Sequence, residues 1–257
     1  MDGLPSIDWP VPGAFPALAP GEVHEWCAWL DAPAANDAAA VAVLSADERN
    51  RAAAFHFAAD QRRYVAAHAM VRRVLARYLG CEAATLVFAA GPSGKPALTT
   101  GGLEFNLAHS GPLGLLAVAR DQAVGVDVEL RWEMPDLAFL EEKMFVPAAL
   151  GRQQRLGPAQ RLRGFYRRWT ELEAIGKCRG TGLELEQWVP GTEHLAHVDP
   201  AGGFTGCLAC ERPPARVALF QYSPEVLTAP SKTTVATHPI LPGLPHRLEG
   251  LARLSSS

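Results

Sequence analysis

Hydrophobic residues recur at helical spacing in several long stretches of the chain. Between residues 64 and 79 they lie three and four positions apart, the period of a helix that buries one face. Gly80 follows where such a helix commonly ends. Residues 137–150 and about 161–178 have the same character, and Gly180 follows the second of these stretches. The pattern therefore predicts three helices in these places.

A serine followed by acidic residues predicts one more helix upstream. Ser45 can accept a hydrogen bond from the backbone of a first helical turn, and Asp47 and Glu48 put negative charge near the helix amino end. We expect a helix to begin directly after Ser45.

Shorter stretches have the alternating apolar and polar residues of strands. Residues 22–30 alternate in part, and residues 115–119 and 124–129 form two strand-like runs joined by a turn. The sequence FNLAHSG, residues 105–111, has the character of a strand that runs into a turn. Further strand-like pieces continue to about residue 222.

The two ends of the chain lack both patterns. Residues 1–20 are rich in proline and alanine, which predicts an irregular N-terminal arm. In residues 223–257, prolines, serines and threonines dominate and periodicity disappears, so a disordered tail is predicted there.

Composition and charge narrow the classes of protein to consider. The 257 residues include 24 Lys and Arg against 27 Asp and Glu, a net charge of −3, which does not suit a nucleic-acid-binding protein with a broad basic surface. No apolar run reaches the roughly 18 residues of a membrane span, and the first residues lack signal-peptide features, so a cytoplasmic location is expected. The five cysteines are scattered, and the lone pair Cys207 and Cys210 is interpreted as structural.

Two acidic residues alternate with valines in Gly125-Val126-Asp127-Val128-Glu129. On a strand, Asp127 and Glu129 point to the same side, where two carboxylates repel unless a cation lies between them. Such oxygen ligands suit Mg²⁺, which is usually held by a few carboxylates and by substrate phosphates. An ordinary strand with one polar face is the alternative interpretation.

A second group of candidate residues has helical spacing. Trp169, Glu173 and Lys177 are four residues apart and share one helix face. Glu173 could complete a carboxylate set while Lys177 neutralises a phosphate. A surface Glu–Lys pair beneath a buried tryptophan explains the same spacing.

Candidate anion contacts lie upstream of these groups. Together they could bind a polyphosphorylated ligand through several charge-assisted contacts, although each one alone could be a solvated surface charge. The chain contains neither the P-loop motif nor the dinucleotide-binding glycine motif, so a phosphate site must be built from dispersed side chains. The candidate anion contacts are Arg51, Arg62, Arg63, Lys95 and His109.

In their order and separation, four motifs resemble those of the 4′-phosphopantetheinyl transferases. The likeness is closest to the monomeric surfactin-synthetase-activator type and covers about residues 44–183. The motifs are Gly94-Lys95-Pro96, the stretch from Phe105 to Gly111, the stretch from Gly125 to Glu129, and Trp169 with Glu173 and Lys177.

The resemblance implies an activity and a role for each residue. It implies transfer of 4′-phosphopantetheine from coenzyme A to a serine of an apo acyl or peptidyl carrier protein, as in fatty acid, polyketide or non-ribosomal peptide biosynthesis. The by-product is 3′,5′-ADP. By the same resemblance, Asp127, Glu129 and Glu173 would hold Mg²⁺ or Mn²⁺. The implied catalytic residues are Glu173, as base, with Lys177 and His109, and the implied coenzyme A contacts are Arg51, Arg63, Lys95, Asn106, His109 and Lys177.

The resemblance also implies an α+β fold, a pseudo-dimer of two similar subdomains that each pack a small antiparallel sheet on a long helix. Residues 21–123 would form the N-terminal subdomain and residues 124–222 the C-terminal one, with the site between them. The expected partners are coenzyme A and carrier-protein domains, with no nucleic acid and no membrane, and the chain is expected to be a monomer.

Departures from the family pattern bear on two alternative activities. Ala108 stands where relatives usually have serine or threonine, Leu172 replaces a basic residue, and Gly176 replaces a larger apolar one. A relative that binds carrier proteins without catalysis is therefore an alternative. A metal-dependent nuclease is disfavoured, because its lysine normally lies two residues from an acid on the same strand, whereas Lys177 lies four residues from Glu173 on a predicted helix.

Overall fold

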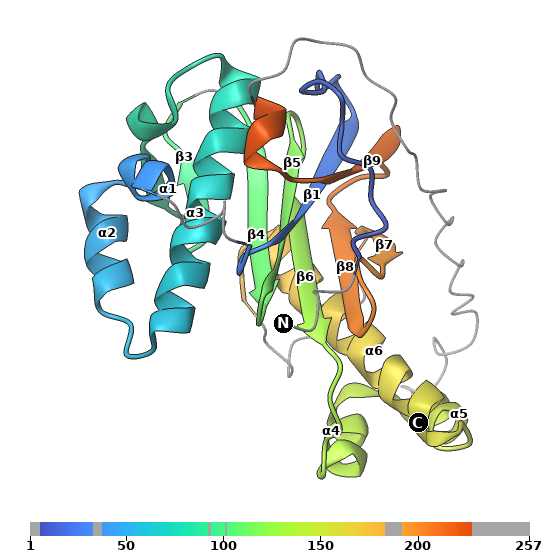
Figure 1. Ribbon diagram of the computed structural model, residues 1–257. Helices are drawn as coiled ribbons and strands as arrows, with labels where there is room; N and C mark the ends of the chain where they lie inside the picture. Colours follow the sequence, from blue (N-terminus) through green and yellow to red (C-terminus); the bar gives the residue numbers. More distant parts are fainter. Residues whose placement is uncertain (1–5, 33–37, 92–93, 101, 183–191, 228–257) are drawn as a thin grey trace.

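Two small sheets meet around a shared hydrophobic core in the computed structural model, which describes residues 6–32, 38–91, 94–100, 102–182 and 192–227 (Figure 1). The first sheet has the strand order β4-β5-β1-β9 and the second the order β6-β8-β7. Their strands are β1 (Glu22–Trp29), β4 (Glu104–Ser110), β5 (Leu113–Ala119), β6 (Val124–Leu130), β7 (His194–Val198), β8 (Phe204–Cys210) and β9 (Arg216–Gln221).

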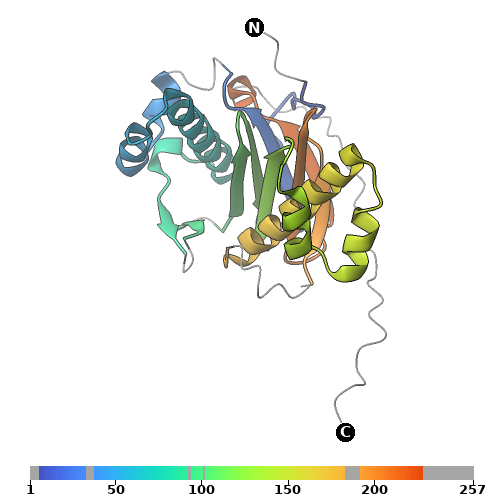
Figure 2. The ribbon, with the colours of Figure 1, turned by 90° about the horizontal axis from the view of Figure 1, so that it is seen from below.

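One long helix covers each sheet. Helix α3 (Ala58–Leu79) packs its apolar face on the first sheet, and α6 (Pro158–Arg179) packs on β6 and β8 of the second. Seen from below, the sheets lie between these two helices (Figure 2). The smaller elements are α1 (Ala38–Ala42), α2 (Ala46–Ala53), α4 (Leu137–Met144), α5 (Pro147–Gln153), the β2 (Phe88–Ala90) and β3 (Pro96–Leu98) hairpin, and 3₁₀ turns η2 (Ala83–Thr85) and η4 (Pro224–Leu227).

The predicted helix ends are confirmed, with one correction. Ser45 caps α2 in a capping box with Glu48. Gly80 and Gly180 end α3 and α6 with φ values of 66° and 72°, a left-handed conformation that glycine adopts without steric cost. The single helix predicted over residues 137–150 is wrong: it is two helices, because Pro147 cannot donate the backbone hydrogen bond that would continue the first and instead begins α5.

Strand β1 lies inside the first sheet. It pairs antiparallel with β5 and parallel with β9, so the last of the described strands lies beside the first. With neighbours on both edges and cores on both faces, six of its eight residues are buried. The architecture is α+β, as predicted, while the similarity of the two halves stays a prediction.

Side chains join the two sheets where β4 meets β6. Among the described strands, β4 and β6 form no backbone ladder. Instead, Asn106 Oδ1 accepts a hydrogen bond from Val126 N at 2.8 Å, and Ser110 Oγ accepts one from Leu130 N at 3.1 Å. These two contacts, four residues apart on β4, hold β6 at both ends.

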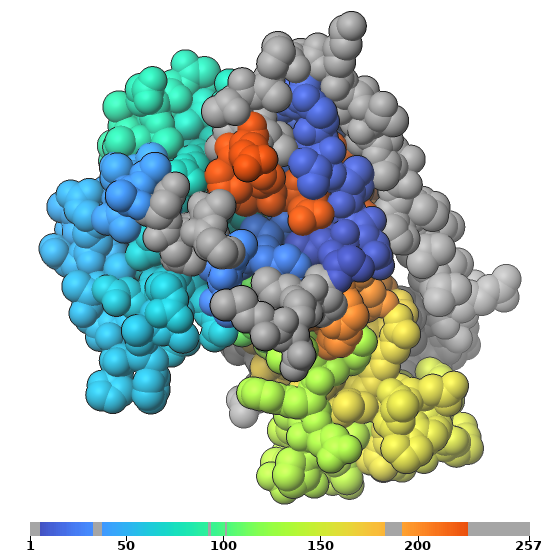
Figure 3. All heavy atoms as spheres, in the orientation of Figure 1, coloured from blue at the N-terminus to red at the C-terminus, as the bar shows by residue number. Residues whose placement is uncertain are grey.

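Helices α4 and α5 form a bulge beside the start of α6, away from the α2–α3 side of the molecule (Figure 3). The buried carboxylate of Glu141 in α4 accepts hydrogen bonds from Arg161 of α6 and from Gln153 of α5, and so ties the three helices together. No helix within the described ranges combines the length and apolar character needed to cross a bilayer.

Candidate functional site

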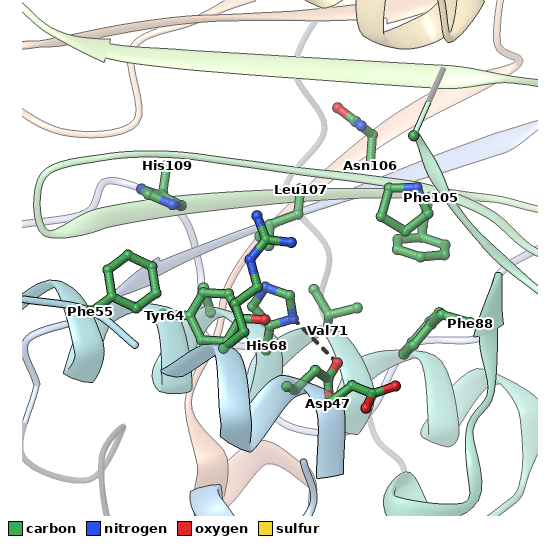
Figure 4. Close-up of a pocket in the computed structure, with 15 residues that line it drawn as sticks. Asp47, Phe55, Tyr64, His68, Val71, Phe88, Phe105, Asn106, Leu107 and His109 are labelled. Atoms are coloured by element: carbon green, nitrogen blue, oxygen red, sulfur yellow. Dashed lines mark hydrogen bonds and ion pairs between the residues drawn. The ribbon is translucent and has the colours of Figure 1, made fainter. Parts of the chain in front are cut away.

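A pocket of about 560 Å³ opens between α2, α3 and strand β4 (Figure 4). Tyr64, His68 and Val71 of α3 face Leu107 and His109 of β4 across this space. The residues that line it are Asp47, Glu48, Arg51, Phe55, Tyr64, Ala67, His68, Val71, Phe88, Gly94, Pro96, Phe105, Asn106, Leu107 and His109. Aromatic walls with a few cations and amides can hold a flat ring and an attached phosphate.

Successive side chains of strand β4 point to opposite faces of the sheet, so FNLAHSG faces the pocket on one side and the core on the other. Phe105, Leu107 and His109 line the pocket on the side of α3. Ala108 points the other way and is buried in the core between the two sheets. The side chain that Ala108 lacks therefore belongs to the core side of the strand, not to the wall of the pocket.

Glu48 organises the helical wall of the pocket. Its carboxylate lies 3.3 Å from His68 Nδ1 and accepts hydrogen bonds from Arg72 Nε at 2.6 Å and Ser45 N at 2.8 Å. Although burial alone would raise its pKa, these hydrogen bonds lower the pKa of Glu48 to about 2. His68 in turn stacks on Tyr64 with ring centroids 4.0 Å apart, so Glu48 fixes both rings.

His109 lies at the rim of the pocket, and the next residue, Ser110, contacts the carboxylate of Glu129. The His109 side chain is exposed, yet enough protein surrounds the ring that desolvation lowers its pKa. The positive charges of His68, Lys177 and Arg63 lower the pKa further. A bound anion would interact favourably with these positive charges.

Asp127 and Glu173 share one lysine next to this rim. Lys177 Nζ lies 2.5 Å from Asp127 Oδ1 and 3.9 Å from Glu173 Oε2. Burial raises the pKa of Asp127 to about 7 even though Lys177 acts to lower it, and the charges of Glu129 and Glu173 add to the rise. Sequence positions 50 residues apart are thus brought together by the packing of α6 on β6.

Glu129, the third expected metal ligand, has a different contact. Its Oε2 accepts a hydrogen bond from Ser110 Oγ at 2.7 Å. Within the described residues, no three His, Cys, Asp or Glu side chains form a group that could hold a metal ion as they stand, so the predicted triad is not assembled as a metal site. The donor chemistry nevertheless fits a hard divalent cation, because Asp127 Oδ2 is buried without a hydrogen-bond partner and two further carboxylates are near enough to affect its pKa.

Two of the residues predicted to contact phosphate, Lys95 and Arg63, form hydrogen bonds within the protein. Lys95 Nζ donates to the backbone oxygens of Val124 at 2.9 Å and Cys178 at 3.3 Å, and so ties its loop to β6 and α6. Arg63 binds Asp31 through a two-nitrogen contact and lies outside the pocket lining. The predicted residues Arg51, Asn106 and His109 do line the pocket.

The aromatic part of the pocket is not evident from the sequence. Tyr64 and His68 belong to the helix predicted over residues 64–79, and together with Phe88 they line the cavity. The spacing of Tyr64 and His68, four residues apart on one helix face, was the available signal. It could not be separated from ordinary core spacing.

Comparison with known proteins identifies the same family as the motifs. A sequence model described as 4′-phosphopantetheinyl transferase, N-terminal, matches residues 28–121. The 4′-phosphopantetheinyl transferase HetI of Nostoc sp. is 36% identical over 175 residues, which cover 66% of this chain and 74% of that protein.

More distant relatives agree. A phosphopantetheinyl transferase of Thraustochytrium sp. is 32% identical over 183 residues, 64% of this chain and 63% of that protein. A 4′-phosphopantetheinyl transferase of Bacillus subtilis is 27% identical over 146 residues, 56% of this chain and 64% of that protein. In both cases the chain spans slightly less than two thirds of the relative.

Proposed function

Because this chain belongs to the 4′-phosphopantetheinyl transferase family, we propose that it transfers 4′-phosphopantetheine from coenzyme A to a serine of an apo acyl or peptidyl carrier protein. The reaction requires Mg²⁺ and releases 3′,5′-ADP. The observation that carries this proposal is the shared contact of Lys177 with Asp127 and Glu173 beside the His109 rim of the pocket.

Coenzyme A is proposed to bind with its nucleotide in the pocket. Tyr64, His68 and Phe88 offer rings for the adenine, while Arg51 and His109 offer cations for phosphate. Because the charge of Lys177 lowers the pKa of His109, the pyrophosphate is proposed to extend from His109 toward Lys177 and the carboxylates. Asn106 lies between the pocket and the carboxylates, and its hydrogen bond with Val126 N holds β4 against β6.

The proposed chemistry follows from what lies at the carboxylate end. Asp127, Glu129 and Glu173 would hold the divalent cation, which supplies charge neutralisation on the pyrophosphate. Glu173 takes the proton of the carrier serine while the serine oxygen bonds to the phosphorus that bears the pantetheine arm. The bond from that phosphorus to 3′,5′-ADP breaks, and Lys177 neutralises charge on the oxygens of the transferred phosphate.

The test is to mix the chain with Mg²⁺, coenzyme A and an apo carrier domain, and to measure the carrier by mass spectrometry. We expect the mass of phosphopantetheine to be added. Asp127→Ala or Glu173→Ala should reduce the rate by at least about a hundredfold, because each removes charge from the proposed cation site. Both variants should keep the circular dichroism spectrum of the wild type.

Glu82→Ala is the matched control, because Glu82 is an exposed acid that lies outside the pocket lining. It should transfer at the wild-type rate. Full activity of both Asp127→Ala and Glu173→Ala would contradict the metal assignment. Binding of the carrier domain without any mass gain would instead indicate a relative that binds carriers without catalysis.

A further inference from the structure

A single hydroxyl connects FNLAHSG to the acidic strand. Ser110 Oγ donates its hydrogen bond to Glu129 Oε2 at 2.7 Å and accepts one from Leu130 N at 3.1 Å. A serine hydroxyl has one proton to donate, so accepting from Leu130 leaves that proton free for the Glu129 carboxylate. The two contacts together fix the rotation of the hydroxyl.

The strand that carries Ser110 is itself held against β6. Asn106, four residues earlier on β4, accepts from Val126 N at 2.8 Å, and β4 is paired along its length with β5. Ser110 therefore cannot move independently of the sheet. The Ser110 hydroxyl keeps a fixed position relative to β6.

Glu129 needs such a support more than its neighbour Asp127 does. Asp127 is short, buried and held by Lys177, whereas Glu129 is longer and only half-buried near the end of β6. A long carboxylate side chain that is free in solvent loses rotamer freedom when it binds a ligand. Holding the side chain in advance removes part of that cost.

We propose that Ser110 is a positioning residue that holds the carboxylate of Glu129 in place for a divalent cation. This inference rests on the proposed function, because it assigns Glu129 to the cation. It gives the serine of FNLAHSG a role in metal affinity that is separate from the phosphate role of His109.

The test uses the full chain and Mn²⁺ alone, with free Mn²⁺ measured by electron paramagnetic resonance. Ser110→Ala should weaken Mn²⁺ binding about tenfold, the usual effect of removing a group that supports a metal ligand. Ser110→Thr keeps the hydroxyl and should restore the affinity to within about threefold of wild type. Ser110→Cys, which keeps the size but not the strong donor, should behave like Ser110→Ala and replaces it if that variant does not fold.

Two controls separate positioning from loss of stability. Ser45→Ala removes the cap of α2 and should lower the melting temperature, but should leave Mn²⁺ affinity unchanged. In a Glu129→Ala background, Ser110→Ala should cause no further loss of affinity, because its partner is absent. Equal Mn²⁺ affinity of folded Ser110→Ala and wild type would overturn the proposal, and so would a tenfold loss that persists without Glu129.

The carrier-modification assay distinguishes this failure from failure of the proposed function. If wild type binds Mn²⁺ and modifies the carrier, but Ser110→Ala binds Mn²⁺ equally well, only the positioning role is wrong. If wild type neither binds Mn²⁺ nor modifies the carrier, the proposed function and the positioning role are both wrong.

Discussion

His109 combines exposure at the pocket rim with a lowered pKa. Desolvation, together with the charges of His68, Lys177 and Arg63, keeps the imidazole mostly neutral at neutral pH in the absence of ligand. A phosphate beside the ring would favour the imidazolium and raise that pKa. Binding of coenzyme A is therefore expected to take up a proton at His109.

The affinity for coenzyme A should consequently fall as the pH rises from about 6 to about 8, since proton uptake becomes less favourable. His109→Gln should bind coenzyme A about tenfold more weakly at the lower pH, since it lacks the charge-assisted hydrogen bond, and with a shallower pH dependence. Calorimetric titration across this range measures both effects. Free coenzyme A titrates identically in both experiments, so matching pH profiles would contradict the role of His109.

At the scale of elements, the site depends on how closely α6 approaches β6. Gly125 allows this approach: a Cβ atom there would lie 2.1 Å from the backbone oxygen of Ala174 and 2.3 Å from the nitrogen of Cys178. Both contacts are with helix backbone, which cannot rotate away as a side chain can. The missing side chain of Gly125 thus sets the distance at which Lys177 of α6 reaches Asp127 of β6.

Gly125→Ala should destabilise the protein by about 1–3 kcal/mol, because the added methyl group forces the helix off the strand. It should also lower the rate of carrier modification, since Glu173 and Lys177 move with α6. Thermal melting and the mass-spectrometric assay measure the two effects. Gly151→Ala is the matched control, because its Cβ would meet no atom closer than 3.8 Å and alanine favours the helix. If Gly125→Ala had the melting temperature and activity of the wild type, the close packing of α6 on β6 would be wrong.

For the molecule as a whole, strand β9, the last of the described strands, completes the first sheet. Strand β9 pairs with β1, and its residues alternate between two cores: Val217 and Leu219 face the core between the sheets, while Ala218 and Phe220 face α3. Phe220 packs on Trp26 of β1 with ring centroids 4.8 Å apart. A division of the chain near residue 123 therefore separates strands that share one sheet.

A fragment of residues 1–123 is accordingly expected not to fold alone, because β1 would have an open edge and both cores would be incomplete. Its far-ultraviolet circular dichroism should show no cooperative thermal transition, whereas the full chain should melt cooperatively. Adding the fragment 124–257 should restore the transition. Cooperative melting of 1–123 by itself would contradict this prediction and support autonomous subdomains.

The helix ends could be predicted from the sequence, because the residues that mark them act locally. Ser45, Gly80 and Gly180 act through their own backbone and its nearest hydrogen bonds, so the helix ends that they mark are confirmed. The division of residues 137–150 was missed, although Pro147 carried the signal.

Long-range contacts explain what could not be predicted. Lys95 resembles a phosphate ligand in sequence, but it binds the carbonyl oxygens of Val124 and Cys178, which only the packing of β6 and α6 places near its loop. For the same reason, no pattern in the chain indicated that Ser110 would hold Glu129.

The sequence by itself determined the family, the α+β class and the residue types available for the chemistry, because motif order and periodicity are properties of the chain alone. The tertiary structure decided which of those residues meet. Asp127 and Lys177 come together, Ala108 turns into the core, and Ser110 supports Glu129. Hydrogen bonds act over about 3 Å, and segments far apart along the chain reach that distance only when the sheets and helices have packed.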